Sequence, residues 1–348
     1  MGLPIKPGCL AVILIAVSLG AFGADSSASR TRPGLQIQAG LDGEIYPVFA
    51  NFASLQKQNA RNFGTVTVTI TNPSRETVRK RVSVQVPGWS DRETQIVELA
   101  PGASQKLIFA PSFLPRLYQN HEIVAATASV SVADLDGSNV FEATAPIRLR
   151  SSEDMYWGPD FKFASFIASW VTPHDPRVEA VLAEAKRYTP DHRLPGYEDW
   201  KNAEAQEQET YRESKAIYTA LQRMGLSYVK SSLTLGGNGD FSERVRMPEV
   251  SLGETSMNCI DAAVMYASLF ENLGMDAKVI VVPGHAYVGV RVATASPKFL
   301  VIDGALTGRV SFAAAVASAE GGLAAREPSS VVQIMVPEAR SAGIYPMP

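Results

Sequence analysis

Cysteine is scarce in this chain of 348 residues, which contains only Cys9 and Cys259. So low a count excludes the disulfide-rich secreted scaffolds and the zinc sites built from several cysteines. Histidine is scarce too, and its four residues lack the spacing of metal ligands, so we expect neither a metal nor another cofactor. The sequence also lacks a glycine-rich phosphate-binding loop.

A strong charge of either sign is missing as well. The formal net charge is -3, and basic residues occur only in isolated clusters such as Arg79–Arg81. Nucleic acid is therefore not an expected partner. After the first residues, no apolar run approaches the roughly 20 residues of a membrane-spanning helix, so we expect no membrane association of the mature protein.

The N-terminus carries the features of a secretion signal. Lys6 precedes the apolar run Cys9–Phe22, and Ala21–Gly23 supplies small residues for a signal peptidase. The pattern predicts a signal peptide over residues 1–23, followed by export to the periplasm or the medium. The alternative is an uncleaved anchor, but the run is shorter than the roughly 20 residues that span a bilayer.

Cleavage would make Cys259 the only thiol of the mature protein, which would then have no internal disulfide. A single cysteine in an exported protein is either a reactive thiol or a small buried apolar residue. The residues around Cys259 must distinguish between the two.

Strand patterns fill the first half of the chain. Thr65–Ile70 alternates between polar and apolar residues before a turn at Thr71–Ser74, and Leu135–Gly137 is a hairpin signal between two β-branched runs. Many short strands with regular turns predict a β-sandwich over residues 34–150. This pattern resembles an immunoglobulin-like domain of a bacterial envelope protein.

A second domain is expected over residues 155–348, because the composition shifts near Ser151–Asp154. Helix patterns occur there at about 176–188 and 202–224. Asp175 is a good N-cap for the first of these helices. The two domains together predict an α+β protein.

Cys259 opens the strongest helix pattern of the chain. Thr255 or Ser256 is the expected cap, an apolar stripe follows, and Gly274 is expected to end the helix. In the first turn, the partial positive charge of the helix end favours the thiolate, which is the reactive form. Backbone N–H groups at the same end can bind a developing oxyanion.

Two further residues can complete this chemistry. His285 is the first residue of a strand pattern that follows a strand over 277–282, and Asp303 comes directly after a strand over 299–302. Antiparallel neighbours would bring Asp303 beside His285. The imidazole can then accept the thiol proton and protonate a leaving amine, while the carboxylate fixes its tautomer.

These segments resemble the transglutaminase-like superfamily, and more narrowly its bacterial branch with a Pro-Gly-His-Ala motif. The resemblance rests on Asn-Cys-Ile-Asp, the apolar helix ending in Leu-Gly, Gly-His-Ala-Tyr-Val and Ile-Asp-Gly, and it extends from about Phe163 to the C-terminus. It implies a papain-related α+β fold with Cys259 as nucleophile, His285 as base and acid, and Asp303 as orienter. One departure is Ala286, where the family often has an aromatic residue.

The implied activity is that of an exported cysteine peptidase or amidase working through a thioester. We expect hydrolysis over cross-linking, because water is the default acceptor and the sequence shows no amine-binding feature. Peptides, protein side-chain amides and peptidoglycan stem peptides all stay open as substrates. The alternative is a non-catalytic envelope protein that uses the same fold for binding, which would predict an inert, buried Cys259.

The oxyanion donors are only partly predictable. The backbone N–H of Cys259 is the first candidate. Tyr228, Gln222 and Asn258 are candidates for the second donor, and each also has a plain structural interpretation.

Overall fold

The computed structural model describes residues 35–348, with gaps at 42, 57–62, 64, 199–201, 231–232, 236–240 and 295. The predicted signal peptide, 1–23, lies outside the described residues. The fold is mixed α+β, with several sheets and helices, as the sequence predicts at this level.

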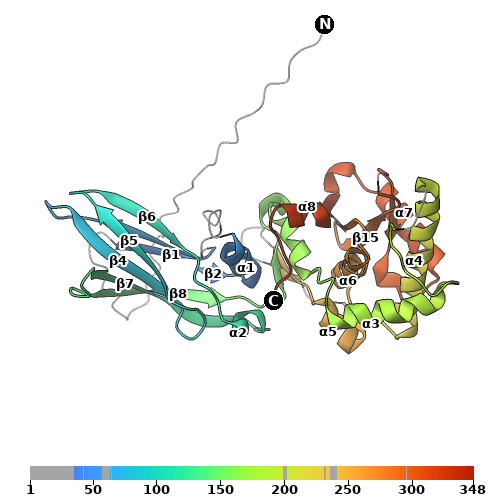
Figure 1. The fold of residues 1–348 in the computed structure, drawn as a ribbon, viewed down its shortest axis with the longest axis horizontal. Helices are drawn as coiled ribbons and strands as arrows, with labels where there is room; N and C mark the ends of the chain where they lie inside the picture. Colours follow the sequence, from blue (N-terminus) through green and yellow to red (C-terminus); the bar gives the residue numbers. More distant parts are fainter. Residues whose placement is uncertain are drawn as a thin grey trace, which may run out of the picture. The chain divides into compact units, whose positions relative to one another are not determined.

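Two sheets form the first part of the described chain and share one apolar core. One sheet has the order β1-β3-β6 and the other β2-β8-β7-β4-β5, and all neighbours are antiparallel except β2 and β8. Figure 1 shows β4, β5, β7 and β8 running side by side. The strands are β1 (Leu35–Ala39), β2 (Glu44–Ile45), β3 (Val66–Thr71), β4 (Val78–Gln85), β5 (Glu93–Leu99), β6 (Ser104–Phe109), β7 (Val124–Asp134) and β8 (Phe141–Leu149).

The alternation of apolar and polar residues explains how these strands form. In β3 the side chains of Val66, Val68 and Ile70 are buried, while the threonines between them are half-buried. A strand with period two buries one face only, and this is the pattern in the sequence. Helix α1 (Pro47–Leu55), which begins with proline at its first position, interrupts a region where the sequence pattern indicated only strands.

Short elements connect the sheets to the helical part. Residues 151–154 are buried rather than exposed, and Asp154 begins a strand. That strand is the edge of a sheet with the order β11-β12-β9. The elements here are α2 (Pro115–Tyr118), β9 (Asp154–Tyr156), η2 (Pro159–Phe161), η3 (Ala164–Trp170), β11 (Leu233–Leu235) and β12 (Phe241–Arg244).

The two helices predicted after residue 175 are present, and each has an N-cap, of which the Asp175 cap was predicted. Asp175 accepts hydrogen bonds from the N–H groups of Arg177 and Val178, and Asn202 accepts one from Ala205. The helices of this part are α3 (Pro176–Ala185), η4 (Lys186–Tyr188), α4 (Ala203–Arg223), α5 (Pro248–Glu254), α6 (Cys259–Asn272), η6 (Gly304–Leu306), α7 (Phe312–Ala324), η7 (Pro328–Ser330) and α8 (Val336–Ser341).

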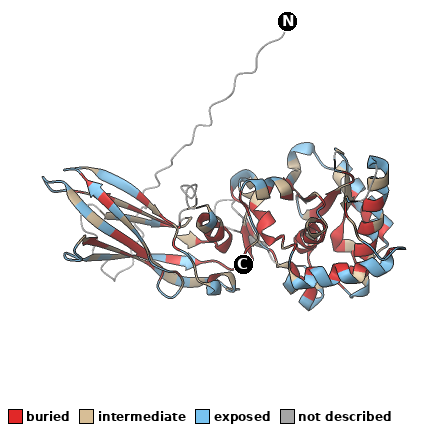
Figure 2. Cartoon of the chain, viewed as in Figure 1, coloured by how far each residue is buried: buried red, intermediate tan, exposed pale blue. Residues whose placement is uncertain are grey.

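Helix α6 is the centre of this part of the molecule. It packs against β14, β15, α3 and α5. Figure 2 shows that α6 is buried, whereas α4 has one side exposed to solvent. A helix with apolar residues on every face needs such a central position. The sheet beside it has the antiparallel order β16-β15-β14-β17. Its strands are β14 (Ala277–Val282), β15 (His285–Arg291), β16 (Phe299–Ile302) and β17 (Val332–Met335), and a parallel pair consists of β10 (Ser227–Tyr228) and β13 (Ser256–Met257).

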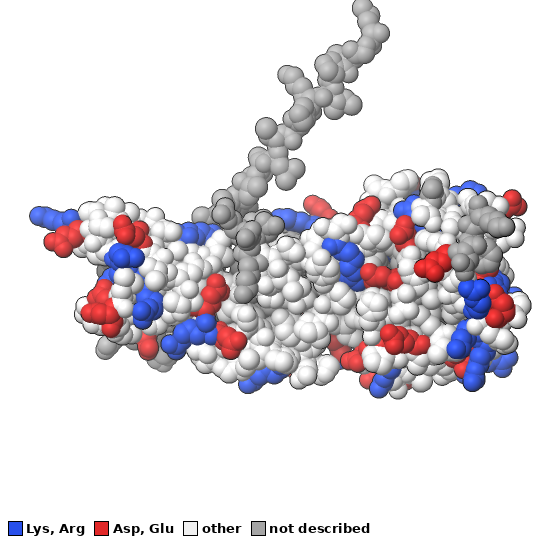
Figure 3. All heavy atoms as spheres, in the orientation of Figure 1, with Lys and Arg blue, Asp and Glu red and all other residues white. Residues whose placement is uncertain are grey.

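No helix in the described part of the chain is both long and apolar enough to cross a bilayer. Helix α4, with 21 residues, has the length but carries charged residues along most of it. On the face drawn in Figure 3, basic and acidic side chains are interspersed.

Candidate active site

Cys259 is the first residue of α6, but the cap differs from the prediction. Neither Thr255 nor Ser256 caps the helix: Thr255 ends α5 in a left-handed conformation, and Ser256 belongs to β13. The N-cap is Asn258, whose Oδ1 accepts from the Asp261 N–H at 2.8 Å. The Asp261 carboxylate accepts in return from the Asn258 N–H at 2.9 Å. This reciprocal capping box fixes the first turn more fully than a lone hydroxyl would.

The Cys259 thiol is free, partly exposed and hydrogen-bonded to the His285 side chain. Because Cys259 lies at the first helical position, the unpaired N–H groups of the first turn surround it. Their partial positive charge favours a thiolate at this point.

His285 joins the thiol to a carboxylate. Its Nε2 lies 3.0 Å from Oδ1 of Asp303, which is buried. Since the carboxylate occupies Nε2, the imidazole nitrogen left for the thiol is Nδ1. Ser318, on α7, donates its hydroxyl to the other carboxylate oxygen of Asp303 at 3.2 Å. The structure therefore brings Cys259, His285 and Asp303 into one connected chain of hydrogen bonds.

The surroundings of His285 favour its charged form. Burial alone would lower the pKa of the imidazole, but hydrogen bonds to Asp303 and Cys259, with the negative charges of both, outweigh burial and raise the pKa to about 9. At neutral pH the ring is therefore an imidazolium ion. An imidazolium beside a thiol stabilises the thiolate by direct charge attraction.

Strand register brings the carboxylate to the imidazole. Val288 pairs with Ile302, so continuing the register puts Asp303 opposite Tyr287. His285 is two residues from Tyr287 on the same face of β15, and their rings meet edge-to-face with centroids 4.7 Å apart. A diagonal neighbour of this kind is within reach of a side chain. Tyr287 therefore supplies an aromatic contact to His285, one position later than the family pattern suggested.

Gly304 allows this end of β16 to approach α6. A Cβ at that position would lie 3.0 Å from the Ala262 Cβ and 3.1 Å from a ring carbon of Tyr266. The absence of a side chain lets the chain turn against α6 directly after Asp303.

The three candidates for a second oxyanion donor have different environments. Gln222 donates its amide to the Val310 carbonyl at 3.1 Å, and Asn258 caps α6. Tyr228 lies in β10, paired with Met257, and the residue is 42% exposed. Among the described residues its hydroxyl has no hydrogen-bond partner. Burial and then the charge of Cys259 raise the pKa of this phenol, which stays a donor.

Two contributors to the site have no local sequence signal. Ser318 reaches Asp303 only because α7 packs against β16, and Arg246 binds Asp261 from the segment after β12. The Asn-x-x-Asp spacing of the capping box was visible in the sequence. Its recognition would have identified Asn258 as the cap.

Metal ligation is not indicated by the described residues, which contain no group of three or more His, Cys, Asp or Glu side chains able to hold an ion. His121 lies 3.4 Å from the Glu153 carboxylate. It is remote in sequence from the elements that carry Cys259.

Comparison with protein-family models, with curated proteins and with solved structures found no match. The geometry of Cys259, His285 and Asp303, and the motifs that contain them, are therefore what bears on function.

Proposed function

We propose that the protein is a cysteine amide hydrolase of the transglutaminase-like type, with an immunoglobulin-like β-sandwich over 34–150 and the catalytic domain over 155–348. One observation carries the proposal. A partly exposed thiol at the start of a helix is hydrogen-bonded to an imidazole whose other nitrogen lies 3.0 Å from a buried carboxylate. A nucleophile, a base and an orienting group in this order are what acyl transfer through a thioester requires.

The reaction begins with attack of the Cys259 thiolate on the amide carbonyl carbon. The carbonyl electrons move to oxygen, and the resulting oxyanion accepts hydrogen bonds from the backbone N–H of Cys259 and the Tyr228 hydroxyl. The intermediate collapses to a thioester as the His285 imidazolium protonates the departing amine. Neutral His285 then takes a proton from water, whose oxygen attacks the thioester and releases a carboxylic acid and the thiolate. Asp303 holds the imidazole in place throughout.

Hydrolysis is proposed over cross-linking, because water needs no binding site of its own. The substrate is proposed to be a peptide, a protein side-chain amide or a peptidoglycan stem peptide, met outside the cytoplasm after cleavage of the signal near Gly23. A purely binding role predicts an inert, buried thiol. The exposure of Cys259 and its hydrogen bond to His285 favour the enzyme instead.

Alkylation of Cys259 by iodoacetamide tests this proposal without a known substrate. We expect labelling near neutral pH, slowed about tenfold or more in His285→Asn, because the imidazolium that favours thiolate is gone. Mass spectrometry of the peptide that contains Cys259 gives the rate.

A thioester adduct should form with a reactive peptide substrate and be absent in Cys259→Ala. Equal labelling rates with and without His285, or activity in Cys259→Ala, would refute the triad.

A further inference from the structure

A fully buried carboxylate lies two residues after the proposed nucleophile. Asp261 has 0% side-chain exposure, and besides the Asn258 N–H it accepts three contacts from a single residue, Arg246. The Arg246 backbone N–H donates to Oδ1 at 2.8 Å, Nε donates to Oδ2 at 2.9 Å, and Nη2 lies 2.8 Å from Oδ2. A single arginine, Arg246, thus holds the Asp261 side chain in the first turn of α6.

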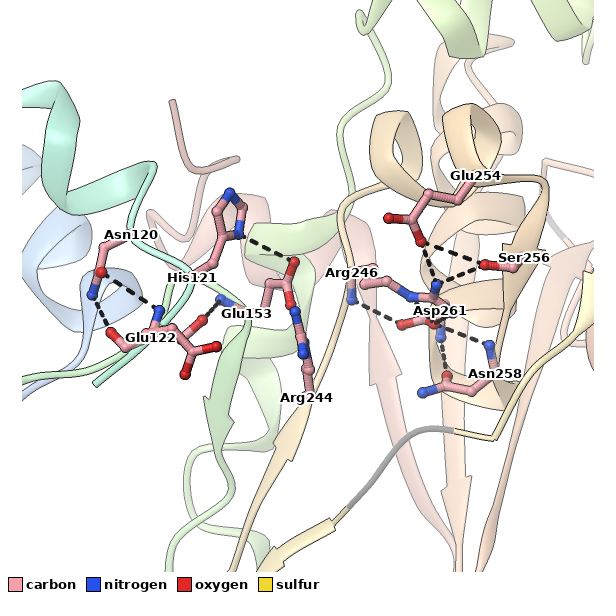
Figure 4. A network of polar contacts seen from close by, with 11 residues as sticks. Asn120, His121, Glu122, Glu153, Arg244, Arg246, Glu254, Ser256, Asn258 and Asp261 are labelled. Carbon is pink, nitrogen blue, oxygen red and sulfur yellow. Dashed lines mark hydrogen bonds and ion pairs between the residues drawn. The ribbon is translucent and has the colours of Figure 1, made fainter. Parts of the chain in front are cut away.

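The other side of Arg246 is held as well. Its Nη1 donates to Glu254 at 2.9 Å and to the Ser256 hydroxyl at 2.8 Å, and the side chain is mostly buried. Figure 4 shows the guanidinium between Asp261 and the pair Glu254 and Ser256. A planar guanidinium bound on several edges is fixed in orientation as well as in charge.

The charge of Asp261 opposes the proposed chemistry unless a cation cancels it. A buried anion near Cys259 disfavours a second negative charge on the thiol, and it offsets the positive end of α6. Yet the capping box needs Asp261 as an acceptor for the Asn258 N–H. A carboxylate that is neutralised by a fixed guanidinium satisfies both needs.

We propose that Arg246 is a positioning residue that acts on Cys259 through Asp261. It cancels the charge of the buried cap and orients the cap, so that the first turn of α6 stays electropositive at the thiol. The proposal rests on the proposed function only in that Cys259 is the nucleophile.

Other charged or titratable groups face the same region and must stay constant in a test. The thiol faces His285 on β15, and its charge is felt by Tyr228 on β10 and Tyr287 on β15. Asp261 is near Glu243 on β12, whose carboxyl also contacts Trp157. None of these needs to be altered in the variants below.

The experiment is the pH profile of iodoacetamide labelling at Cys259 in the full chain, measured beside thermal unfolding. In Arg246→Met we expect the midpoint of this profile to rise by about one pH unit, because the charge of Asp261, two residues after the thiol in α6, is then no longer cancelled. In Asp261→Asn we expect the midpoint to stay or to fall, because the guanidinium is then unpaired and the amide oxygen still accepts from Asn258. In the double variant, which combines Arg246→Met with Asp261→Asn, the midpoint should return toward that of the wild type.

Arg244→Met is the matched control. Arg244 is the last residue of β12, two positions before Arg246, but it pairs with Glu153 and its side chain is 45% exposed, so the midpoint should not move. Arg246→Lys, which keeps the charge, should recover most of the wild-type midpoint.

A rise in Asp261→Asn, or a double variant that resembles Arg246→Met, would overturn the proposal. If Arg246→Met does not fold, the proposal is still overturned by a higher midpoint in Asp261→Asn, or by a midpoint in Arg246→Lys that departs clearly from that of the wild type. The His285→Asn arm reports separately on the proposed function, because it tests the thiol–imidazole pair without touching Arg246 or Asp261.

Discussion

At the scale of single residues, His285 connects the thiol with the carboxylate, and its ionisation should report on that connection. The imidazole contacts both groups through different nitrogens, and its pKa is raised to about 9 although burial opposes the shift. The charge state of this ring at neutral pH therefore depends on Asp303.

Asp303→Asn should lower the pKa of His285. Labelling of Cys259 at pH 7 should slow once that pKa falls below 7, by roughly tenfold for each further unit lost, because the imidazolium fraction then falls in proportion. The effect on stability has a defined sign. A pKa raised from 6.5 to about 9 means that the pairing contributes fully below about pH 6.5 and is lost as the pH rises through about 9.

Proton NMR titration of the imidazole, with urea unfolding at pH 6 and pH 9.5, measures both effects. The stability gap between wild type and Asp303→Asn should be larger at pH 6. An imidazole that titrates equally high in the variant would contradict this account.

At the scale of elements, α4 contains a buried acid that the proposed chemistry does not use. Glu213 is fully buried, and its Oε1 accepts from the Gly196 N–H at 3.0 Å. Burial raises its pKa to about 8, and the nearby charge of Glu209 adds to the rise. The folded protein therefore holds this proton at pH values where the unfolded chain has released it.

This difference predicts that stability falls as the pH rises from about 4.5 through about 8, because ionised Glu213 is disfavoured only in the folded state. Glu213→Gln, which keeps the shape and cannot ionise, should flatten that fall. Urea unfolding of both proteins across this range is the measurement. Parallel curves for the two proteins would show that Glu213 is not the source.

Elements that depend on local pattern were predictable from the sequence. The bounds of β14 and β16, the first residue of β15 and the Asp175 cap follow from alternation and capping chemistry. Helix α1 was missed because strand patterns surround it. The elements and the cap that were predicted correctly share one property: the residues that determine them are neighbours along the chain.

The parts of the site that were not predictable depend on tertiary packing. Ser318 meets Asp303, and Arg246 meets Asp261, each across 15 residues and between different elements. No period or spacing marks such pairs in a single sequence. The order of Cys259, His285 and Asp303 suggested their meeting only because each begins or follows a predictable element.

At the scale of the whole described chain, Arg150 links elements from both halves. Its guanidinium donates to Asp154 at 2.9 Å, to Glu44 at 3.1 Å and to Ser242 at 3.3 Å, and it lies over the Tyr46 ring. The side chain is only 9% exposed. Arg150 is the main cation beside the buried Asp154 carboxylate, whereas Glu44 also pairs with Arg148.

Arg150→Met should therefore lower the free energy of unfolding by about 3–5 kcal/mol, the cost of leaving buried charges unpaired. Arg148→Met is a matched control, because Arg148 also pairs with Glu44 but is 62% exposed. An exposed pair contributes about 0–1 kcal/mol. Urea unfolding of both variants compares them, and equal losses would mean that burial of Arg150 is not what matters.

Cys259 and His285 are each the first residue of their element, at the margin of the core that α6 and β15 build. The side chains that hold the fold together are thus mostly different from those proposed to react. A lineage of such proteins can lose the thiol or the imidazole by one substitution and still inherit the same fold. Descendants that have lost the thiol or the imidazole, and that are retained because their surfaces bind a partner, are then expected in such a lineage.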